Sequence, residues 1–415
     1  MEKRVVITGM GVISPIGNSI NEFHDNMFAG VCGIDRLQGF DDYNLTVSVA
    51  GQVKNFKATE HGLSAGDARR SDLYCHYGMA AAIQAMNDSG LVSGENIEPE
   101  NLGVYVGTGI GGMKTFMEQC RVLENEGAGR ISPLFIPMMI PNIAGGNIAI
   151  RFKAQGPALT TVAACATGTN AIGEAYRAIK HGYTQAAITG GAEAVVNPLA
   201  IGAFANSKAL TLESDPKRAC IPFDVNRKGF VMAEGAGIMI LEELEHAKAR
   251  GAKIYAEVVG YGNTCDAYHY TAPSPDGIPA SRAIKMALDQ AEYKAGENLY
   301  INAHGTSTHL NDTSETKAIK LAMGEEEARR ASISSTKSMT GHMLGATGAV
   351  ELIASVMALQ DDMVPPTIGL VDQDPECDLD YTPLKAKKRD LDIAISNSLG
   401  FGGHNACVAL RKYKA

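Results

Sequence analysis

A single cysteine stands where a nucleophile would be placed. Cys165 lies in the segment Thr161–Asn170, where the apolar run Leu159–Ala163 predicts a short buried strand and the residues from Ala166 onward predict a helix. At a helix N-terminus, unpaired N–H groups and the helix dipole lower the pKa of a thiol and supply donors for an oxyanion. Taken alone, Cys165 is equally consistent with a small buried core residue.

Three glycine-flanked loops in the second half of the sequence hold the other reactive side chains. They are Asn302–Asp312, Ser334–His342 and Ser398–Asn405. Because ligands of α/β sheets bind beyond the carboxyl ends of strands, we expect these loops and Cys165 to converge on one cleft. One loop histidine is more often solvated or satisfied than catalytic. His304 and His342 together, with Lys337 and the cysteine, favour a catalytic interpretation.

Two histidines beside a thiol suit a condensation better than a hydrolysis. A neutral imidazole can donate an N–H to a carbonyl oxygen that gains charge, as when a malonyl thioester loses CO2 and leaves an enolate. A cysteine protease would need an activated water and usually one base with an orienting carboxylate or amide. The sequence therefore predicts carbon–carbon bond formation at a thioester.

The glycine motif Gly107–Gly112 matches the dinucleotide pattern GxGxxG literally. A dinucleotide site also needs an acidic residue at the end of the next strand, about twenty residues on. Glu124 and Glu126 fall in a predicted helix tail instead. We therefore predict that this turn allows tight packing beside the catalytic loops.

Composition restricts the class of protein. The chain has 415 residues, 45% of them hydrophobic, which is enough for two domains or one doubled unit. A balance of 37 basic against 46 acidic residues gives no general reason for nucleic-acid binding. Eight scattered cysteines without a CxxC pair indicate a reducing, cytoplasmic setting. Prolines 137 and 141 interrupt the most apolar region, Leu134–Ile150, so we expect no membrane span.

The second half of the chain repeats the first in outline. Predicted strands alternate with helices, which indicates a largely parallel sheet covered by helices. Paired segments of similar sequence are 6–11 with 257–262, 104–109 with 300–305, the Cys165 unit with 333–359, and 187–191 with 394–398. Such doubling predicts two similar halves, 1–250 with the nucleophilic cysteine and 251–415 with the histidines, the lysine and the last loop.

These motifs, in this order, resemble the β-ketoacyl-acyl-carrier-protein synthases of type II fatty acid synthesis, and most closely the synthase II branch. The resemblance rests on four segments spread over nearly the whole chain: Val5–Gly11, Ala163–Gly168, Asn302–Thr308 and Gly400–Asn405. It implies an α/β, thiolase-like fold whose two similar βα halves form a five-layered α-β-α-β-α arrangement. It also implies a homodimer, an acyl carrier protein as partner, and chemistry without a metal or nucleotide cofactor.

The resemblance also implies roles in catalysis. Cys165 takes the acyl chain as a thioester, with the backbone N–H groups of Cys165 and Phe401 as the oxyanion hole. His304 and His342 stabilise the enolate of malonyl-carrier protein after decarboxylation, and its carbanion attacks the acyl-Cys165 carbonyl. The product is a 3-oxoacyl chain two carbons longer, on the carrier. Lys337 supports the histidines and pairs with Glu351.

Further residues are implied in binding. Phe401 resembles a gate in a glycine loop, and Thr306 and Thr308 resemble the hydroxyls that bind the phosphopantetheine arm. Gly400 and Gly402 belong with these substrate-binding positions, and Asn405 has a supporting role. Basic residues expected to dock the acidic carrier protein are Arg69, Arg70 and Lys208. The chain departs from the family pattern at Gly66, where a lysine is common, and at His309, where a proline is usual.

Related classes differ at particular residues. Cys407 is followed by Val408 and Ala409, whereas a degradative thiolase has a late Cys-x-Gly motif. An initiating synthase pairs its cysteine with histidine and asparagine, but this chain has His342 at the second position. The alternative from another class is a catalytically silent partner that binds acyl chains or the carrier protein, and Cys165 argues against it.

Overall fold

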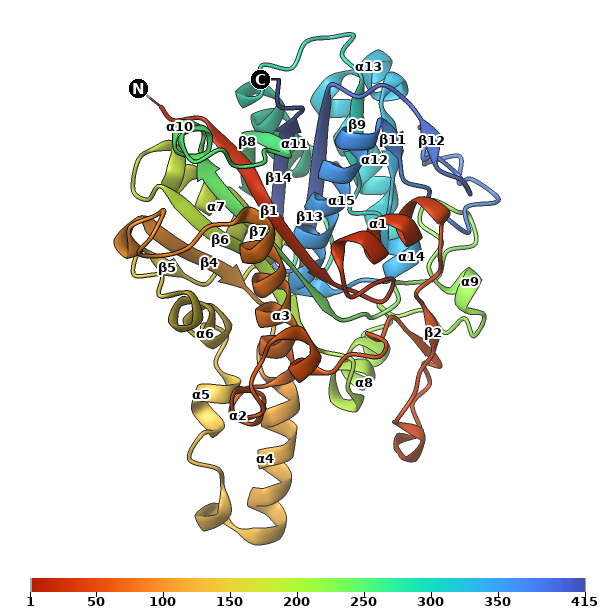
Figure 1. Ribbon diagram of the computed structural model, residues 1–415. Coiled ribbons are helices and arrows are strands. Elements are labelled where there is room, and N and C mark those ends of the chain that lie inside the picture. The colour runs from red at the N-terminus through yellow and green to blue at the C-terminus, as the bar shows by residue number, and fades with distance from the viewer. Residues whose placement is uncertain (1, 415) are drawn as a thin grey trace.

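The computed structural model describes residues 2–414 and contains one long mixed sheet (Figure 1). From one edge to the other, its strands are β10 (Ser332–Ser334), β9 (Leu299–Asn302), β13 (Ile393–Gly400), β14 (His404–Arg411), β8 (Ala256–Cys265), β1 (Val5–Ile13), β7 (Gly235–Glu243), β6 (Ala186–Glu193), β4 (Leu102–Gly107) and β5 (Ala158–Leu159). The order is symmetric about the β1–β8 pair. Each strand of the second half therefore has a counterpart in the first half: β8 corresponds to β1, β9 to β4, β10 to β5, β13 to β6 and β14 to β7.

The strand directions follow the same symmetry. The two outermost pairs at each edge, β10–β9–β13 and β6–β4–β5, are parallel, whereas all the pairs between β13 and β6 are antiparallel. The expectation of a largely parallel sheet was therefore wrong. The physical reason is that β14 follows β13 through a tight hairpin, which forces antiparallel pairing, and β7 takes the equivalent place in the first half.

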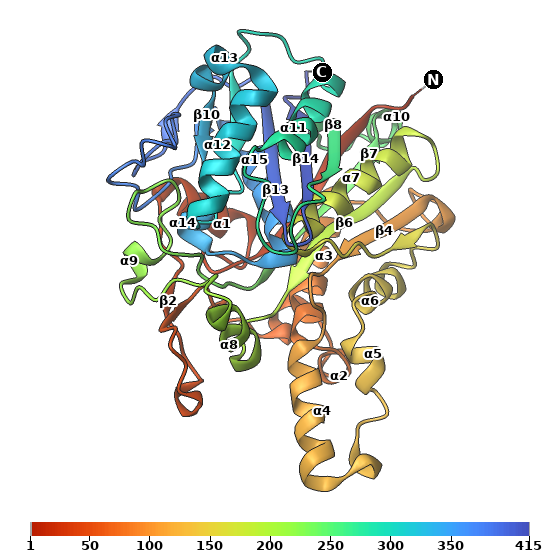
Figure 2. The ribbon, with the colours of Figure 1, turned by 180° about the vertical axis from the view of Figure 1, so that it is seen from behind.

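Helices complete five layers (Figures 1 and 2). α3 (Leu73–Ser89) and α6 (Ile143–Phe152) cover one outer face, and α11 (Ile278–Gln290) and α12 (His309–Met323) cover the other. α7 (Thr167–Lys180) and α15 (Thr347–Asp361) contact strands of both halves and form the central layer. Every residue of α15 from Thr347 to Leu359 is buried, as expected of a helix covered on all sides. The predicted five-layered thiolase-like arrangement is confirmed.

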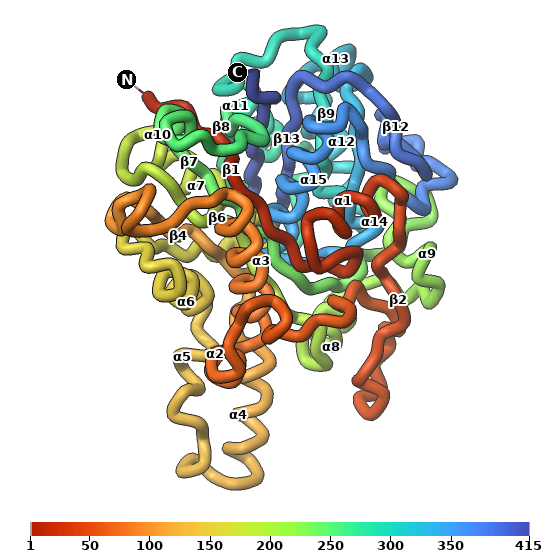
Figure 3. The backbone as a smooth tube through the Cα atoms, in the orientation of Figure 1, coloured from red at the N-terminus to blue at the C-terminus, as the bar shows by residue number. Residues whose placement is uncertain are grey.

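The remaining elements lie around these layers. They are α1 (Ile20–Ala29), α2 (Ala65–Arg69), α4 (Met113–Glu126), α5 (Phe135–Met139), α8 (Pro198–Asn206), α9 (Pro216–Ala219), α10 (Leu244–Ala249), α13 (Glu325–Arg330), α14 (Lys337–Thr340) and the short pairs β2 (Asp35–Arg36) with β3 (Val49–Ala50) and β11 (Met363–Val364) with β12 (Lys387–Lys388). The segment with α4 and α5 extends away from the layered body (Figure 3). The symmetric strand order places the division between the halves in the segment from α10 to β8, and the boundary at residue 250 stays a prediction.

The same sharp turn precedes both central helices. A single 3-10 turn, Ala164–Ala166, leads into α7, and its counterpart Leu344–Ala346 leads into α15. The first residue of each turn has a left-handed φ, 47° at Ala164 and 44° at Leu344, which is uncommon without glycine. Cys165 is the central residue of the first turn, two residues before α7 begins at Thr167.

The strand predicted at 159–163 was wrong. β5 ends at Leu159, and both of its residues are exposed. The backbone N–H of Ala163 donates to the hydroxyl of Thr167 at 2.8 Å, so the chain bends toward α7 before it reaches Cys165. An apolar run near a functional turn therefore does not have to be a strand, because a side-chain acceptor can take the N–H that a ladder would use.

None of the helices within residues 2–414 combines the length and the apolar character that a membrane crossing requires.

The two central helices approach each other at glycines. A Cβ atom on Gly348 of α15 would lie 2.1 Å from the hydroxyl oxygen of Thr169, and one on Gly168 of α7 would lie 2.9 Å from the backbone nitrogen of Ala349. Real side chains do not approach this closely. The crossing of α7 and α15 therefore requires glycine at both positions.

We predict that Gly348→Ala lowers the free energy of unfolding by about 1–3 kcal/mol, because the added methyl group overpacks the crossing. Gly202→Ala is the matched control, since Gly202 is also helical but has no atom within 4 Å of the position of a Cβ. The control is expected to gain up to about 1 kcal/mol from better helix propensity. Thermal and denaturant unfolding measure both changes. Equal effects of the two substitutions would contradict the close crossing.

Candidate active site

Loops from both halves of the chain enclose one cavity of about 410 Å³. Predicted site residues that line it are Cys165, Lys208, His304, Thr306, Thr308, His342, Gly400, Phe401 and Asn405. The structure thus brings together the thiol of the first half and the two imidazoles of the second half. This confirms the prediction that the glycine-flanked loops and Cys165 converge on one cleft. Lys337 and Glu351 are buried outside the lining, and Gly402 is exposed on the neighbouring turn.

Cys165 is almost fully enclosed, with 8% of its surface exposed. Burial raises the pKa of its thiol to about 12, and the nearby Lys337 ammonium and the backbone N–H groups of Phe401 and Cys165 oppose this rise. The sequence-based expectation of a lowered pKa was therefore wrong, because desolvation of the thiolate outweighs the local donors. The family resemblance implied these two N–H groups as an oxyanion hole, and both act on the sulfur.

His304 and His342 face each other edge to face, with ring centroids 5.4 Å apart. Burial and the positive charge of Lys337 hold the pKa of both imidazoles well below the usual value, so both are neutral at pH 7. The Nδ1 atom of His342 lies 3.0 Å from the hydroxyl oxygen of Thr347, and the ring of Phe230 packs against the imidazole edge. Within residues 2–414, His304 Nδ1 and His342 Nε2 have no hydrogen-bond partner.

Glu315 fixes the backbone around His304. Its carboxylate accepts the backbone N–H of His304 at 2.7 Å, the N–H of Gly305 at 2.8 Å and the amide of Asn397 at 2.8 Å. Sequence reasoning did not find this residue. The available signal was an acidic residue on the buried face of α12, nearly two turns into the helix that follows the His304 loop.

Lys337 and Glu351 form a fully buried ion pair, with Nζ and Oε1 separated by 2.5 Å. Burial raises the pKa of Glu351, and the lysine partly reverses that rise. The pairing predicted from the resemblance is thus present in the geometry. The ammonium of Lys337 lies close enough to Cys165 and to both histidines to shift the pKa of all three side chains.

Phe401 lies on the hairpin that joins β13 to β14. Gly402 and Gly403, with φ of 88° and 79°, make the turn, so glycine is needed there for the backbone conformation itself. The N–H of Gly402 donates to the carbonyl of Tyr270 at 2.9 Å, and the N–H of Asp266 donates to the carbonyl of Gly403 at 2.8 Å. The Phe401 ring lies 6.0 Å from that of Phe204 at the cavity wall.

Two neighbouring residues complete the same corner of the site. Gly400 abuts the turn that holds Cys165, because a Cβ there would lie 2.7 Å from the carbonyl oxygen of Ala163 and 3.2 Å from the nitrogen of Cys165. The amide of Asn405 donates to the carboxylate of Asp266 at 2.7 Å. Asn405, predicted to have a supporting role, thus links β14 to Asp266, which itself contacts the hairpin turn at Gly403.

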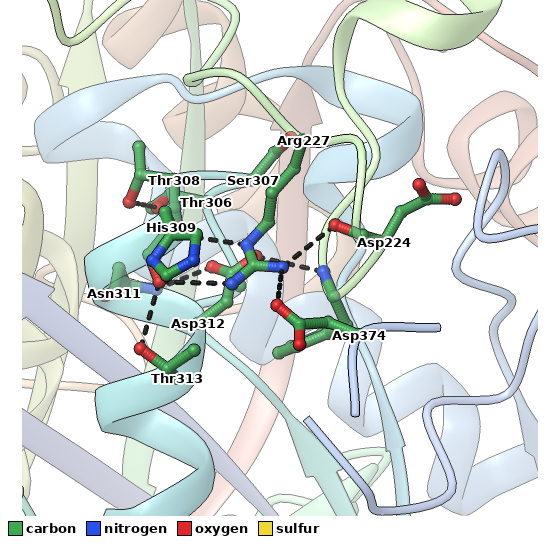
Figure 4. A network of polar contacts seen from close by, with 12 residues as sticks. Asp224, Arg227, Thr306, Ser307, Thr308, His309, Asn311, Asp312, Thr313 and Asp374 are labelled. Atoms are coloured by element: carbon green, nitrogen blue, oxygen red, sulfur yellow. Dashed lines mark hydrogen bonds and ion pairs between the residues drawn. The ribbon is translucent and has the colours of Figure 1, made fainter. Parts of the chain in front are cut away.

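A buried arginine holds the loop with the two threonines (Figure 4). Arg227 pairs with Asp374 at 2.7 Å and with Asp312 at 3.4 Å, and it donates to the carbonyl oxygens of Thr308 and His309. The hydroxyls of Thr306 and Thr308 are 2.9 Å apart and both line the cavity. The sequence analysis did not identify Arg227, because nothing local shows that its partners come from α12 and from the segment after β11.

The basic residues predicted to dock a carrier protein occupy two places. Lys208 is exposed at the cavity, and the exposed Lys228, which sequence reasoning missed, lines it as well. Arg69 and Arg70 are exposed at the end of α2 and do not line the cavity. The structure thus brings Lys208 to the site and leaves the arginines on a separate surface.

The glycine turn after β4 binds a carboxylate of the chain itself. Glu193, at the end of β6, accepts the N–H of Gly109 at 2.7 Å, the N–H of Ile110 at 3.2 Å and the hydroxyl of Thr108 at 2.8 Å. It also accepts the N–H of Gly345 at 3.0 Å. The turn therefore packs beside the catalytic loops, as predicted, and its donors are used within the protein.

A thiol backed by two N–H donors, with two neutral imidazoles facing the same cavity, defines a condensing enzyme of the thiolase-like class. Models of the β-ketoacyl synthase N-terminal and C-terminal domains match residues 2–247 and 255–371. The chain belongs to the β-ketoacyl synthase family. Its activity is the condensation that extends acyl chains in fatty acid biosynthesis.

Individual proteins agree with this assignment. The chain is 50% identical over 414 residues to 3-oxoacyl-(acyl-carrier-protein) synthase 2 of Synechocystis sp., covering 100% of this chain and 99% of the relative. It is 49% identical over 413 residues to the protein of the same name from Staphylococcus aureus, with the same coverage.

Solved structures show the same fold. The ketosynthase complex AntDE:AntF, which contains a type II polyketide acyl-carrier protein, matches with a TM-score of 0.92 at 34% identity and covers 100% of both chains. A β-ketoacyl synthase from Burkholderia phymatum matches with a TM-score of 0.92 at 33% identity, covering 99% of this chain and 100% of that one.

The raised thiol pKa predicts how Cys165 responds to alkylation. The thiolate is the reactive form, so the rate with iodoacetamide should rise about tenfold per pH unit between about pH 7 and pH 9. Peptide mass spectrometry on timed samples follows Cys165, and the exposed Cys265 provides an internal reference. A rate for Cys165 that reaches its plateau below about pH 8 would show that the local donors outweigh burial.

Proposed function

We propose that this chain elongates acyl groups presented by an acyl carrier protein, with Cys165 as the acyl acceptor and with His304 and His342 as the groups that stabilise the malonyl-derived enolate. The observation that carries this proposal is that the sulfur and both imidazoles open into one cavity. The backbone N–H groups of Cys165 and Phe401 act on the same sulfur.

In the first half-reaction, the sulfur of Cys165 attacks the carbonyl carbon of the acyl thioester. The thiol proton is lost as the carbon–sulfur bond forms, and the N–H groups of Cys165 and Phe401 stabilise the charge on the carbonyl oxygen. The bond to the carrier sulfur then breaks, and this sulfur leaves as a thiol with one proton. Because burial keeps Cys165 protonated at rest, proton removal belongs to this step.

In the second half-reaction, the malonyl thioester loses its carboxylate as CO2, and the electron pair of that carbon–carbon bond remains as an enolate. Neutral His304 and His342 each donate an N–H to the enolate oxygen, a role that their lowered pKa supports. The enolate carbon attacks the acyl carbonyl on Cys165, and the bond to the cysteine sulfur breaks. The sulfur takes up one proton from solvent, and the 3-oxoacyl product stays on the carrier.

The carrier arm would enter beside the two threonines. Their hydroxyls, 2.9 Å apart at the cavity wall, can bind the amides of a phosphopantetheine arm, and Arg227 keeps their loop in place. Lys208 and Lys228 at the cavity, with Arg69 and Arg70 on α2, supply positive charge for an acidic carrier. The AntDE:AntF structure contains a ketosynthase with its acyl-carrier protein, which supports this class of partner.

The Phe401 hairpin is proposed as the gate. The Phe401 ring lies at the cavity wall on a two-glycine turn, and the Phe401 N–H belongs to the proposed oxyanion hole. A movement of the turn would therefore alter both substrate entry and catalysis.

The two proposed half-reactions use only the thiol, the imidazoles and backbone N–H groups. Neither half-reaction needs a metal or a nucleotide.

A homodimer is proposed from the exposed edge of the sheet. β5 ends the sheet beyond β4 (Figure 1), and its Leu159 is 60% exposed. Ile150 on the adjoining α6 and Val162 just after β5 are 77% and 56% exposed. An unpaired edge strand flanked by exposed apolar side chains is a surface that a second copy can cover, with the same patch on both subunits.

The two histidines give a test that separates the half-reactions. We predict that His304→Ala still loads an acyl group on Cys165 but releases CO2 from malonyl-carrier protein about 100- to 1,000-fold more slowly, since one N–H donor to the enolate is lost. Mass spectrometry of acyl-enzyme and a radiolabelled CO2 assay measure the two steps. Cys165→Ser is the matched comparison and should lose acyl loading. Normal CO2 release by His304→Ala would refute the assigned role.

The proposed dimer predicts that Leu159→Asp shifts the protein to monomers, because the carboxylate would be buried without a partner in the interface. Analytical ultracentrifugation measures the mass over a range of protein concentrations. Val371→Asp is the matched control, since Val371 is 72% exposed on another segment. A monomeric parent protein, or a Leu159→Asp variant that associates as the parent does, would count against this interface.

A further inference from the structure

The three groups that line the cavity floor are also a set of metal donors. The sulfur of Cys165 and one ring nitrogen each of His304 and His342 lie within 4.8 Å of one another, and all three residues are buried. Zn²⁺ bound tetrahedrally to one sulfur and two nitrogens holds these atoms about 3.3–3.6 Å apart, given its usual bond lengths. Side-chain rotations that bring the atoms about 1 Å closer would complete the set.

The orientation of His342 is a second, independent observation. This imidazole is only 2% exposed, and its Nε2 atom has no hydrogen-bond partner among the described residues. Its Nδ1 atom lies 3.0 Å from the hydroxyl of Thr347, which fixes the ring. A hydroxyl can accept a hydrogen bond from Nδ1–H as readily as donate one to a bare Nδ1, so the ring can present a bare nitrogen at Nε2. Histidine ligands of zinc are typically oriented by such a partner.

Charge and access are also compatible with an ion. Lys337 is the positive group that acts on all three donors, and it is paired with Glu351 at 2.5 Å. Lys208, Lys228 and Arg227 also line the cavity, and Arg227 is paired with Asp374 and Asp312. The carboxylate of Glu193 is close enough to act on the Cys165 sulfur in the opposite sense. The cavity reaches all three donors, so the fourth coordination position of a bound ion would face a solvent-accessible space.

We propose that Cys165, His304 and His342 form a reversible Zn²⁺ site that competes with the acyl group for the cysteine sulfur. The ion binds the sulfur and two nitrogens, the thiol proton passes to solvent, and water occupies the fourth position. An acyl thioester on Cys165 removes the thiolate ligand, so acylation and Zn²⁺ binding exclude each other. The inference depends on the donor geometry and not on the proposed role of the residues in condensation.

The structure offers a second donor group that must be distinguished from this one. His309, Asp374 and Glu376 also place ligand atoms within 4.8 Å of one another, near the network in Figure 4. However, Asp374 already accepts Arg227 on one oxygen and the N–H of Glu376 on the other, and His309 and Glu376 are exposed. A surface group without a thiol provides a control for non-specific Zn²⁺ binding.

The full-length, unacylated protein is titrated with Zn²⁺ and, separately, with Co²⁺ as a spectroscopic probe. We expect one equivalent of Co²⁺ to give a thiolate-to-metal absorption band that EDTA abolishes. One equivalent of Zn²⁺ should protect Cys165, but not Cys265, from iodoacetamide in peptide mass spectrometry. Prior loading of Cys165 with an acyl group should prevent both effects.

Variants assign the ligands. Cys165→Ser should lose the Co²⁺ band, and His342→Ala should weaken Zn²⁺ binding by more than about tenfold, the loss found even for outer-shell partners. His309→Ala should leave the band and the affinity unchanged, and circular dichroism checks that each variant is folded. The proposal is overturned if Cys165→Ser and His342→Ala bind Zn²⁺ as the parent does, if His309→Ala alone removes binding, or if no band appears with excess Co²⁺.

Discussion

The close crossing of α7 and α15 is the constraint on which the site depends. Each helix begins in a sharp turn, and the two turns contact each other because glycines let the helices meet without side chains between them. Cys165 lies in one turn, and His342 lies two residues before the start of the other. The distance between the Cys165 sulfur and the His342 imidazole is therefore set by helix packing in the middle layer, and not by the loops that line the rest of the cavity.

Burial at this crossing has an electrostatic consequence. Desolvation alone raises the pKa of Cys165 and lowers the pKa of both histidines, so the resting site holds a thiol and two neutral rings. The ammonium of Lys337 favours the thiolate and disfavours imidazolium, and it therefore lowers the pKa of all three groups. A paired lysine thus keeps the imidazoles as N–H donors while it moderates the cost of ionising the sulfur.

Much of this arrangement could be predicted from the sequence, and each wrong prediction has a physical cause. Glycine-framed loops at strand ends identified His304, Lys337 and the Phe401 loop, because the strands before them were apolar enough to recognise. The antiparallel centre of the sheet was not predictable, since a buried strand has the same composition in either direction. The strand before Cys165 was predicted wrongly, because the hydroxyl of Thr167 captures a backbone N–H that the pattern assigned to a ladder.

The residues that position the site loops could not be predicted from the sequence for a different reason. Glu315 and Arg227 hold the His304 and Thr308 backbones through contacts between elements that lie far apart in the chain. A buried acidic or basic residue is recognisable in a sequence only when its partner is known, and no local pattern connects Arg227 with Asp374. The reactive side chains were therefore predicted better than the groups that position them.

The duplicated fold also explains why only the first of the two turns presents a thiol to the cavity. Gly345 occupies the place in the second turn that Cys165 occupies in the first. A Cβ on Gly345 would lie 2.4 Å from the nitrogen of Gly109 and 2.8 Å from a carboxylate oxygen of Glu193. The carboxylate of Glu193 accepts the N–H of Gly345 and N–H groups of the glycine turn after β4. The second turn is therefore packed against protein atoms, whereas the first turn faces the cavity. The two symmetric helices thus begin in turns with different surroundings, because Glu193 and the glycine turn after β4, both from the first half, close over Gly345.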